Sequence, residues 1–137
     1  MTPTHLLDTG WIVRHLRGSH SYTDALLRIG APRLGLPLVV VAELYEGVHL
    51  SADPVSAETA IEDFMADKVL IPLTEEMCRL FGQHRAQLRR QNQLIGDFDL
   101  LIATACLSHD LVLLTTNRAH FERVPGLRIV SDPLAIA

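Results

Sequence analysis

Acidic and amide side chains follow several short apolar segments of this 137-residue chain. The five that stand out are Asp8, Glu43, Asp97, Asp99 and Asn117. Carboxylates in close quarters cannot all stay ionised unless a cation compensates their charge. Oxygen ligands without clusters of His or thiolate favour Mg²⁺ or Mn²⁺. An ion of this kind with a bound water is suited to hydrolysis of a phosphodiester, which is the first chemistry we expect.

Each of these residues also has a structural explanation when it is taken alone. Asp97 or Asp99 can cap the helix that follows, and Asp8 can initiate a turn or cap a helix. Glu43 is harder to explain in this way, because a carboxylate within the run Val-Val-Val-Ala-Glu-Leu is costly without a partner. The seven histidines show no metal-ligand spacing such as H-E-x-x-H, and we expect most of them at the surface or in the core.

Residues 8–10 read Asp-Thr-Gly, the triad of aspartic proteases. Small proteases of that type have almost all-β folds, whereas this chain has at least four strong helical patterns and Trp11 directly after the triad. Because three residues are a short signal, we reject a peptidase, whose activity would also be insensitive to EDTA.

The elements that must position the candidate side chains alternate between strands and helices. Short apolar runs predict strands at residues 5–7, 36–41, 69–72, 111–115 and 127–130. Helical periodicity predicts helices at residues 10–18, 21–31, 43–50, 57–66 and 97–109, a long helix that Thr74 caps, and a short one near Arg118. This alternation predicts an α/β fold, a three-layer sandwich around a central, mostly parallel twisted sheet of about five short strands. Sites in such sheets form at the carboxyl ends of the strands, where we expect the acids to meet.

No internal repeat or linker divides the chain, so we expect a single domain over residues 1–137. Hydrophobic residues make up 48% of the chain, which excludes a disordered protein, and no apolar run approaches the roughly 18 residues of a membrane span. No basic segment precedes the first apolar run, and the two cysteines suit buried thiols. We therefore expect a cytoplasmic protein without membrane contact.

The net charge of −4, taken alone, argues against a nucleic-acid partner. Setting aside Asp8, Glu43, Asp97 and Asp99 leaves 12 of the 16 acidic residues, as many as the 12 basic ones. A bound cation would offset those four acids, so the net charge does not exclude an RNA substrate. Eleven of the basic residues are Arg, whose planar fork grips phosphate with two hydrogen bonds.

Four segments carry a recognisable pattern. They are Leu-Leu-Asp-Thr at residues 6–9, Val-Ala-Glu-Leu-Tyr-Glu-Gly at 41–47, Ile-Gly-Asp-Phe-Asp-Leu-Leu-Ile-Ala at 95–103, and a closing segment at 114–127. The closing segment contains Leu-Thr-Thr-Asn-Arg-Ala-His-Phe and Val-Pro-Gly-Leu. Together they resemble the PIN-domain ribonucleases, specifically the VapC-type toxins of bacterial toxin–antitoxin pairs. The resemblance covers nearly the whole chain and implies a PIN-like fold.

The resemblance also implies an active site around Mg²⁺, with Mn²⁺ as the alternative ion. The residues it implies are Asp8, Glu43 and Asp99 as metal ligands, with Asp97 and Asn117 as further catalytic candidates. The chain departs from the family at Gly10, where Asn or Ser is usual, and at Asn117, where many members have a fourth Asp. Because a neutral amide at Asn117 weakens a second-metal site, we expect one bound ion.

Four other residues are candidates for substrate contact. Thr9 and Thr116 can position waters or carboxylates, although hydroxyl groups at such positions can equally cap a helix. Arg85 and Arg89 share one face of the long helix. They can contact RNA phosphate or simply be solvated, and the sequence leaves both alternatives open.

The resemblance implies two kinds of protein partner. One is a second copy of the chain, in a homodimer. The other is a small VapB-type antitoxin that reaches into the acidic site, in an assembly that can be of higher order and that contacts DNA only through the antitoxin. The helices at 10–18 and 21–31 offer more apolar residues than one inward stripe needs. Our candidates for antitoxin contact are Trp11, Ile12, Leu16 and Tyr22, for most of which core packing is the alternative.

The sequence thus predicts a magnesium-dependent endoribonuclease toxin that hydrolyses phosphodiester bonds in structured RNA such as tRNA or rRNA. The alternative is a catalytically weak PIN domain that acts with its antitoxin as a DNA-binding autoregulatory complex. Loss of RNA cleavage in Asp8→Asn and Asp99→Asn, with folding kept, distinguishes the two.

Overall fold

The computed structural model of the chain describes residues 2–137, which form a five-stranded, wholly parallel sheet. The strands are β1 (His5–Leu7), β2 (Leu34–Pro37), β3 (Val69–Ile71), β4 (Val112–Leu114) and β5 (Arg128–Val130). Their order across the sheet is β3-β2-β1-β4-β5. Leu6 of β1 pairs with Gly35 on one side and Leu113 on the other. The strand order therefore reverses at β1, and a crevice at such a reversal is where ligands bind in open α/β sheets.

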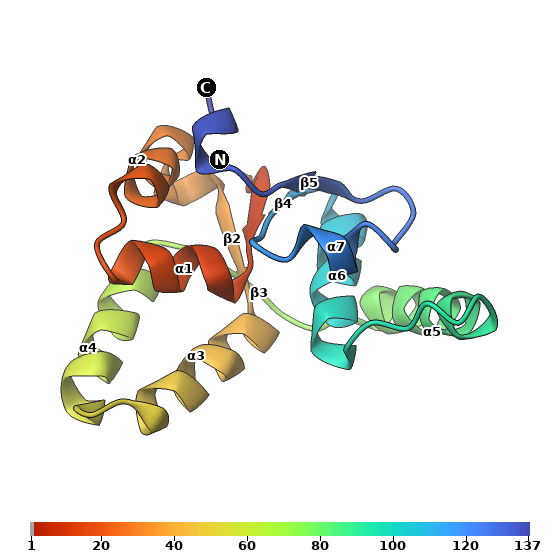
Figure 1. Cartoon of the computed structure of the whole chain (residues 1–137), viewed down its shortest axis with the longest axis horizontal. Helices are drawn as coiled ribbons and strands as arrows, with labels where there is room; N and C mark the ends of the chain where they lie inside the picture. The colour runs from red at the N-terminus through yellow and green to blue at the C-terminus, as the bar shows by residue number, and fades with distance from the viewer. Residues whose placement is uncertain (1) are drawn as a thin grey trace.

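Helices cover both faces of this sheet. They are α1 (Thr9–Leu16), α2 (His20–Ile29), α3 (Leu38–Leu50), α4 (Pro54–Met65), α5 (Glu75–Arg90), α6 (Asp97–His109) and α7 (Arg118–Phe121), with 3₁₀ turns η1 (Ala31–Arg33) and η2 (Pro133–Ala135). Figure 1 shows α1 to α4 on one side of the strands and α5 to α7 on the other. The predicted α/β fold with three layers and a central sheet is confirmed, and the sheet is entirely parallel.

The core lies where the central strands meet α1 and α6. Leu6, Leu7, Leu113 and Leu114 are wholly buried, as expected for strands covered on both faces, which read as continuous apolar runs. Helix α6 is also buried around most of its circumference between Leu100 and Cys106. Because α6 is packed against its neighbours over most of its surface, its first turn is a rigid place for a functional side chain.

One predicted strand is wrong in a way that matters for the site. The run 36–41 does not continue as a strand, because β2 ends at Pro37 and α3 begins at Leu38. The β-branched residues favour a strand locally, but Val40, Leu44 and Val48 are buried at a spacing of four, which is the helical period. Glu43 therefore lies in the second turn of a helix and does not follow a strand.

Two smaller expectations can be checked against the fold. Cys106 is buried in α6, where burial raises the pKa of its thiol, but Cys78 is exposed on α5. The expectation of buried thiols is therefore correct for only one of the two. Across residues 2–137, no helix combines the length and the apolar character that crossing a bilayer requires.

Candidate active site at the carboxyl edge of the sheet

Asp8 is the most firmly held of the predicted site residues. Its amide donates to the carbonyl oxygen of Leu114 at 3.0 Å, so the pairing of β1 with β4 extends one residue beyond β1. One carboxylate oxygen accepts from the amide of Thr9 at 2.8 Å, and the other accepts from the Thr115 hydroxyl at 2.6 Å. Asp8 thus caps α1, as its structural explanation proposed, and its side chain is held at the strand reversal with only 7% of its surface exposed.

Burial and neighbouring charge act together on Asp8. Loss of solvation raises the pKa of its carboxyl, the hydrogen bonds from Thr115 and Thr9 lower it in part, and the negative charge of Asp99 raises it further. A buried carboxylate with a like charge nearby favours protonation or a compensating cation.

Glu43 reaches the same edge from α3. Its Oε1 accepts from the Thr9 hydroxyl at 3.0 Å, so Thr9 positions a carboxylate, which is one of the two roles foreseen for it. Loss of solvation raises the pKa of Glu43, the Thr9 hydrogen bond opposes this, and the charges of Asp8, Asp99 and Glu46 raise it. The fold therefore brings together Asp8, Glu43 and Asp99, which we call the carboxylate cluster.

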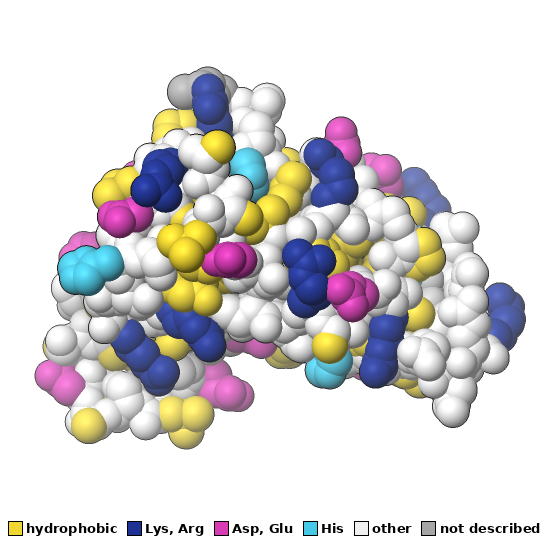
Figure 2. Space-filling view, turned by 45° about the horizontal axis from the view of Figure 1, so that its top comes forward, with side chains coloured by type: hydrophobic (Ala, Val, Ile, Leu, Met, Phe, Trp, Pro, Cys, Tyr) yellow, Lys and Arg dark blue, Asp and Glu magenta, His cyan; other side chains and the backbone are white. Residues whose placement is uncertain are grey.

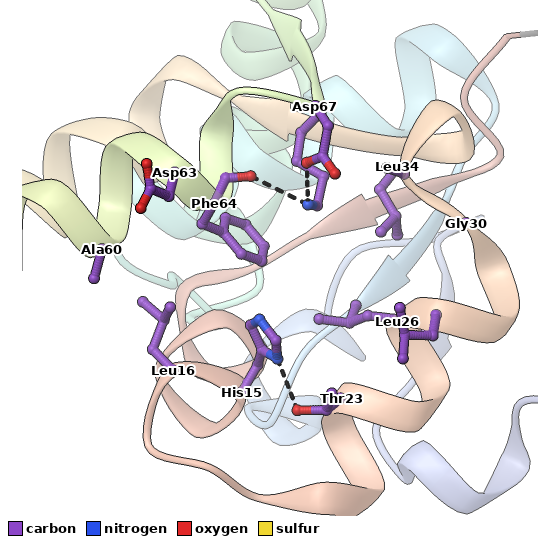
Figure 3. Close-up of a pocket in the computed structure, with 13 residues that line it drawn as sticks. His15, Leu16, Thr23, Leu26, Gly30, Leu34, Ala60, Asp63, Phe64 and Asp67 are labelled. Atoms are coloured by element: carbon purple, nitrogen blue, oxygen red, sulfur yellow. Dashed lines mark hydrogen bonds and ion pairs between the residues drawn. The ribbon is translucent and has the colours of Figure 1, made fainter.

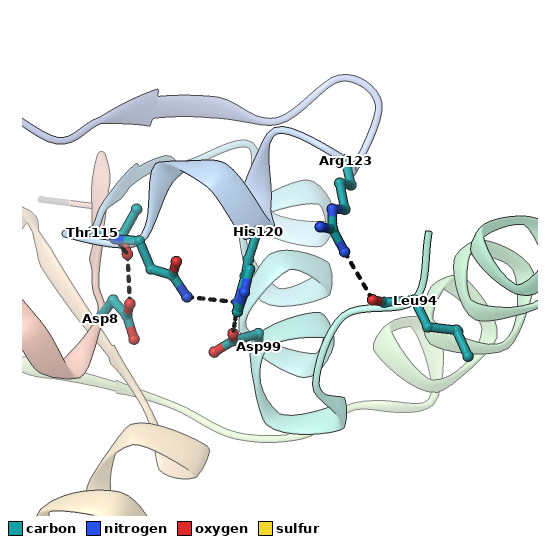
Figure 4. A network of polar contacts seen from close by, with 7 residues as sticks. Asp8, Leu94, Asp99, Thr115, His120 and Arg123 are labelled. Atoms are coloured by element: carbon teal, nitrogen blue, oxygen red, sulfur yellow. Dashed lines mark hydrogen bonds and ion pairs between the residues drawn. The ribbon is translucent and has the colours of Figure 1, made fainter. Parts of the chain in front are cut away.

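Asp99 lies in the first turn of α6, where the positive end of the helix dipole stabilises a carboxylate. The N-cap of α6 is Gly96, with no side-chain hydrogen bond, so the capping explanation for Asp97 and Asp99 does not hold. Oδ2 of Asp99 lies 3.3 Å from Nδ1 of His120, a residue of α7 (Figure 4).

A chain of polar contacts joins the two sides of the cluster (Figure 4). The backbone N–H of Asn117 donates to the Thr115 hydroxyl at 3.0 Å. In the side chain, Nδ2 of Asn117 lies 2.8 Å from Nδ1 of His120. That one nitrogen cannot accept from Asn117 and donate to Asp99 at the same time. The tautomer of His120, that is, whether Nδ1 carries the ring proton, therefore decides which of the two neighbours this nitrogen binds.

Sequence reasoning missed His120. The expectation that most histidines are surface or core residues rested on the lack of any metal-ligand spacing. His120 contacts the cluster through Asp99 across 21 residues of sequence, a relation that only the fold creates. Its signal was its place three residues after Asn117, one helical turn along the closing motif.

Comparison with known proteins assigns the chain that carries this site to a family. The pattern of the PIN domain family matches residues 5–127. The chain belongs to the PIN domain family. Ribonuclease VapC2 of Haemophilus influenzae is 30% identical over 124 residues, which cover 90% of this chain and 94% of that protein. The tRNA(fMet)-specific endonuclease VapC of Salmonella typhimurium is 27% identical over 124 residues, with the same two coverages.

A solved structure agrees with this assignment. The crystal structure of VapBC2 from Rickettsia felis, bound to a DNA fragment from their promoter, matches with a TM-score of 0.86 and 26% identity. The match covers 95% of this chain and 98% of that one. The chain is therefore similar to VapC proteins along almost its whole length, as its motifs indicated.

The donor set of this PIN-domain site fits a hard divalent cation. Its three carboxylates supply only oxygen, and the charge of Asp99 raises the pKa of both Asp8 and Glu43. Within residues 2–137, no three His, Cys, Asp or Glu side chains are placed to hold a metal ion as they stand. Thr9 donates to Oε1 of Glu43, and His120 lies beside Oδ2 of Asp99. The second carboxylate oxygen of each of these two side chains has no hydrogen bond within the described residues, so it is free to face an ion.

Not every predicted residue joins the cluster. Asp97 is exposed and pairs with Arg85, with 2.9 Å between Oδ1 and Nε, and its charge does not contribute to the raised pKa of Asp8 or Glu43. Thr116 is exposed, and its hydroxyl fills the place that a side chain at position 10 would take, so Gly10 permits a close approach of α1 and the β4–α7 loop. Arg89 is exposed on α5, away from these contacts.

The predicted antitoxin contacts divide in the same way. The prediction is wrong for Trp11 and Ile12, because both are wholly buried and present no surface to a partner. Tyr22 is partly buried, with its ring packed edge-on against Trp11 at 5.2 Å between centroids. Leu16 is 38% exposed and lines two neighbouring hollows.

Those two hollows lie along α1 and α4. The first, of about 400 Å³, contains His15, Phe64 and Lys68 (Figure 3). The second, of about 330 Å³, reaches Thr9 and Glu43. Leu16 and Ala60 line both, so the apolar surface ends beside the carboxylate cluster.

Proposed function

We propose that this PIN-domain protein is a metal-dependent endoribonuclease, the toxin of a toxin–antitoxin pair. The observation that carries the proposal is the carboxylate cluster at the strand reversal, where Asp8, Glu43 and Asp99 converge from β1, α3 and α6. The similarity to proteins named ribonuclease VapC supports the same activity.

The chain's own residues have distinct parts in the proposed reaction. Asp8, Glu43 and Asp99 would hold Mg²⁺ or Mn²⁺, and the bound ion would supply an activated water and neutralise charge on the phosphate. The Thr115 and Thr9 hydroxyls orient the carboxylates of Asp8 and Glu43, which lowers the cost of assembling the site.

Asn117 and His120 form the solvent-facing side of the site. His120 has 47% of its side chain exposed and holds Asp99 from that side. The neutral amide of Asn117 adds no charge to the cluster, so we propose one resident ion. Asp97 is paired with Arg85 and so stands apart from these residues, and we assign it no direct part in the reaction.

The proposed substrate is a structured RNA, with tRNA as the first to test. The Salmonella relative is named as specific for tRNA(fMet), and a substrate of the same class is the simplest extension to this chain. An rRNA is the second class to test.

The proposed partner is a VapB-type antitoxin. The Rickettsia neighbour is a VapBC complex bound to promoter DNA, which supports an assembly that reaches DNA through the antitoxin. The two hollows at Leu16 lead to Glu43, and an antitoxin segment lying there can deliver an Arg to the carboxylates. We also propose a homodimer of the toxin.

The test is cleavage of unfractionated tRNA by the purified, antitoxin-free protein. Cleavage is expected with Mg²⁺ or Mn²⁺, and none with EDTA. Asp99→Asn is expected to lower the rate by about a hundredfold or more at unchanged thermal stability. Folded protein that cuts neither tRNA nor rRNA with either ion would contradict the enzyme and favour a regulatory role with the antitoxin on DNA.

A further inference from the structure

Most of α5 and the loop after it form the most basic stretch of the chain. Residues 77–96 contain four Arg and no Asp or Glu. Residues 9–23 and 25–42 are also free of acids but contain only two Arg each. Figure 2 shows dark-blue basic side chains scattered among acidic ones over one face of the molecule. Helix α5 packs on α6 and extends beyond it, away from the sheet (Figure 1).

A shallow hollow of about 360 Å³ lies along this part of α5, and we call it the arginine groove. It is lined by Gly82, Arg85, Ala86, Arg89 and Arg90. Positions three and four apart share one face of a helix, which places the two small residues between the arginines. Gly82 and Ala86 leave room for a backbone to approach the helix, and the arginines stand beside that room.

The arginines of the groove differ in how far the fold engages them. Arg85 is paired with Asp97 in the first turn of α6, two residues before Asp99. Arg89 and Arg90 are exposed, and neither guanidinium has a hydrogen bond or an ion pair anywhere in residues 2–137. The competing explanation is that they stabilise the C-terminal end of the α5 dipole. That role requires no ligand, so it predicts an effect on stability alone.

We propose that the arginine groove binds the phosphodiester backbone of the RNA that the carboxylate cluster cleaves. Guanidinium groups grip phosphate with paired hydrogen bonds, and the small residues let the backbone lie close. The Arg85–Asp97 pair joins the groove to the turn that carries Asp99, so one RNA strand can touch both.

The lining argues against a protein segment as the occupant. Tight protein contacts centre on anchors that are seated in fully desolvated pockets, whereas the groove is shallow, is lined only by Gly, Ala and Arg, and leaves Arg89 and Arg90 exposed. The inference rests on the proposed ribonuclease function, and binding is therefore measured separately from cleavage.

The test is binding of unfractionated tRNA to the cleavage-deficient Asp99→Asn protein in buffer with Mg²⁺. Adding Arg89→Gln and Arg90→Gln is expected to weaken binding by roughly tenfold or more at about 50 mM salt. The slope of log K against log salt is expected to fall in magnitude by about 1.4 to 1.8, the loss of two phosphate contacts. In the protein with Asp99 intact, the same two changes are expected to raise KM for tRNA more than they lower kcat.

Two variants serve as controls. Arg28→Gln with Arg33→Gln removes the same charge from two arginines that are also exposed but lie at the amino ends of the strands, and is expected to leave the salt slope unchanged. Arg89→Lys with Arg90→Lys keeps the charge but loses the paired hydrogen bonds, so it is expected to restore the salt slope and to recover the affinity only in part.

Three results would overturn the inference. They are an unchanged salt slope in the Gln variants, an equal loss in the Arg28 and Arg33 control, or a fall in melting temperature with tRNA binding intact, which is the dipole role. If the protein with Asp99 intact cuts no RNA and these binding changes are still seen, the proposed function fails while the groove stands.

Discussion

The carboxylate cluster and the arginine groove differ in how much of their charge the fold already engages. At the sheet edge, Asp8 is 7% exposed and both its oxygens accept hydrogen bonds. On α5, Arg89 and Arg90 are exposed and have no partner among the described residues. Buried, fully bonded side chains hold a geometry, whereas exposed charges supply affinity that salt weakens. The comparison teaches that the proposed chemistry and the proposed substrate affinity rest on different elements, the ends of the central strands with α3 and α6 in the first case and α5 in the second.

The largest expected effect comes from removing the hydroxyl that holds Asp8. In Thr115→Val the buried carboxylate of Asp8 loses the hydroxyl that donates to it at 2.6 Å, and the backbone N–H of Asn117 loses its acceptor. We expect the free energy of unfolding to fall by about 1–3 kcal/mol and RNA cleavage to slow, as measured by urea denaturation and by tRNA cleavage. The adjacent Thr116→Val, at an exposed position, is the matched control and is expected to change stability by less than about 0.5 kcal/mol. If Thr115→Val and Thr116→Val lowered stability and cleavage equally, the buried hydrogen bond to Asp8 would have no special importance.

A smaller effect is expected in the pH dependence of stability. Burial and neighbouring carboxylates raise the pKa of Asp8 and Glu43 in the folded chain. A carboxyl with a raised folded pKa stabilises the fold below its unfolded pKa, near 4, and this stability is lost as the pH rises through the folded pKa. Cation-free protein is therefore expected to lose stability as the pH rises from about 4, and Asp8→Asn to lose less.

The measurement is urea denaturation over a pH series with EDTA, followed by the same series with Mg²⁺. The ion is expected to restore stability near neutral pH in the wild type, because a ligand that binds only the folded state stabilises it. Identical pH dependence in the wild type and Asp8→Asn would show that Asp8 carries no such penalty.

The smallest expected effect compares two acids in one helical turn. Asp97 is exposed and paired with Arg85, and exposed ion pairs contribute little. Asp97→Asn is expected to change the free energy of unfolding by less than about 0.5 kcal/mol and to slow tRNA cleavage far less than Asp99→Asn does. A loss of cleavage as large as that of Asp99→Asn would place Asp97 in the cluster after all.

Much of the fold follows from local pattern. The predicted strand 5–7 and helix 97–109 match β1 and α6 residue for residue, because each has clear boundary signals and a strongly apolar interior. The run 36–41 was misassigned because β-branched residues favour strands locally, while the packing of Val40 and Leu44 selects a helix.

The site was predictable in part for a related reason. Asp8 directly follows β1 and Asp99 lies in the first turn of α6, and the sequence marks both elements clearly. His120 stands in the closing motif three residues after Asn117, but nothing in that motif points to Asp99. Trp11 and Ile12 look as suitable for a surface as for a core. Periodicity shows that a helix has an apolar face, but not which neighbours cover it.

The sequence by itself determined the alternation of strands and helices, the PIN-type motifs and the identity of the three acids. Only the tertiary structure decided that Glu43 reaches the site from a helix, that Asp97 turns to Arg85, and that His120 holds Asp99. The physical reason is that composition and periodicity act over a few residues. A buried carboxylate, by contrast, is satisfied by hydroxyl and imidazole groups such as Thr115, 107 positions along the chain from Asp8, which only the packing of the sheet and its helices brings within hydrogen-bond distance.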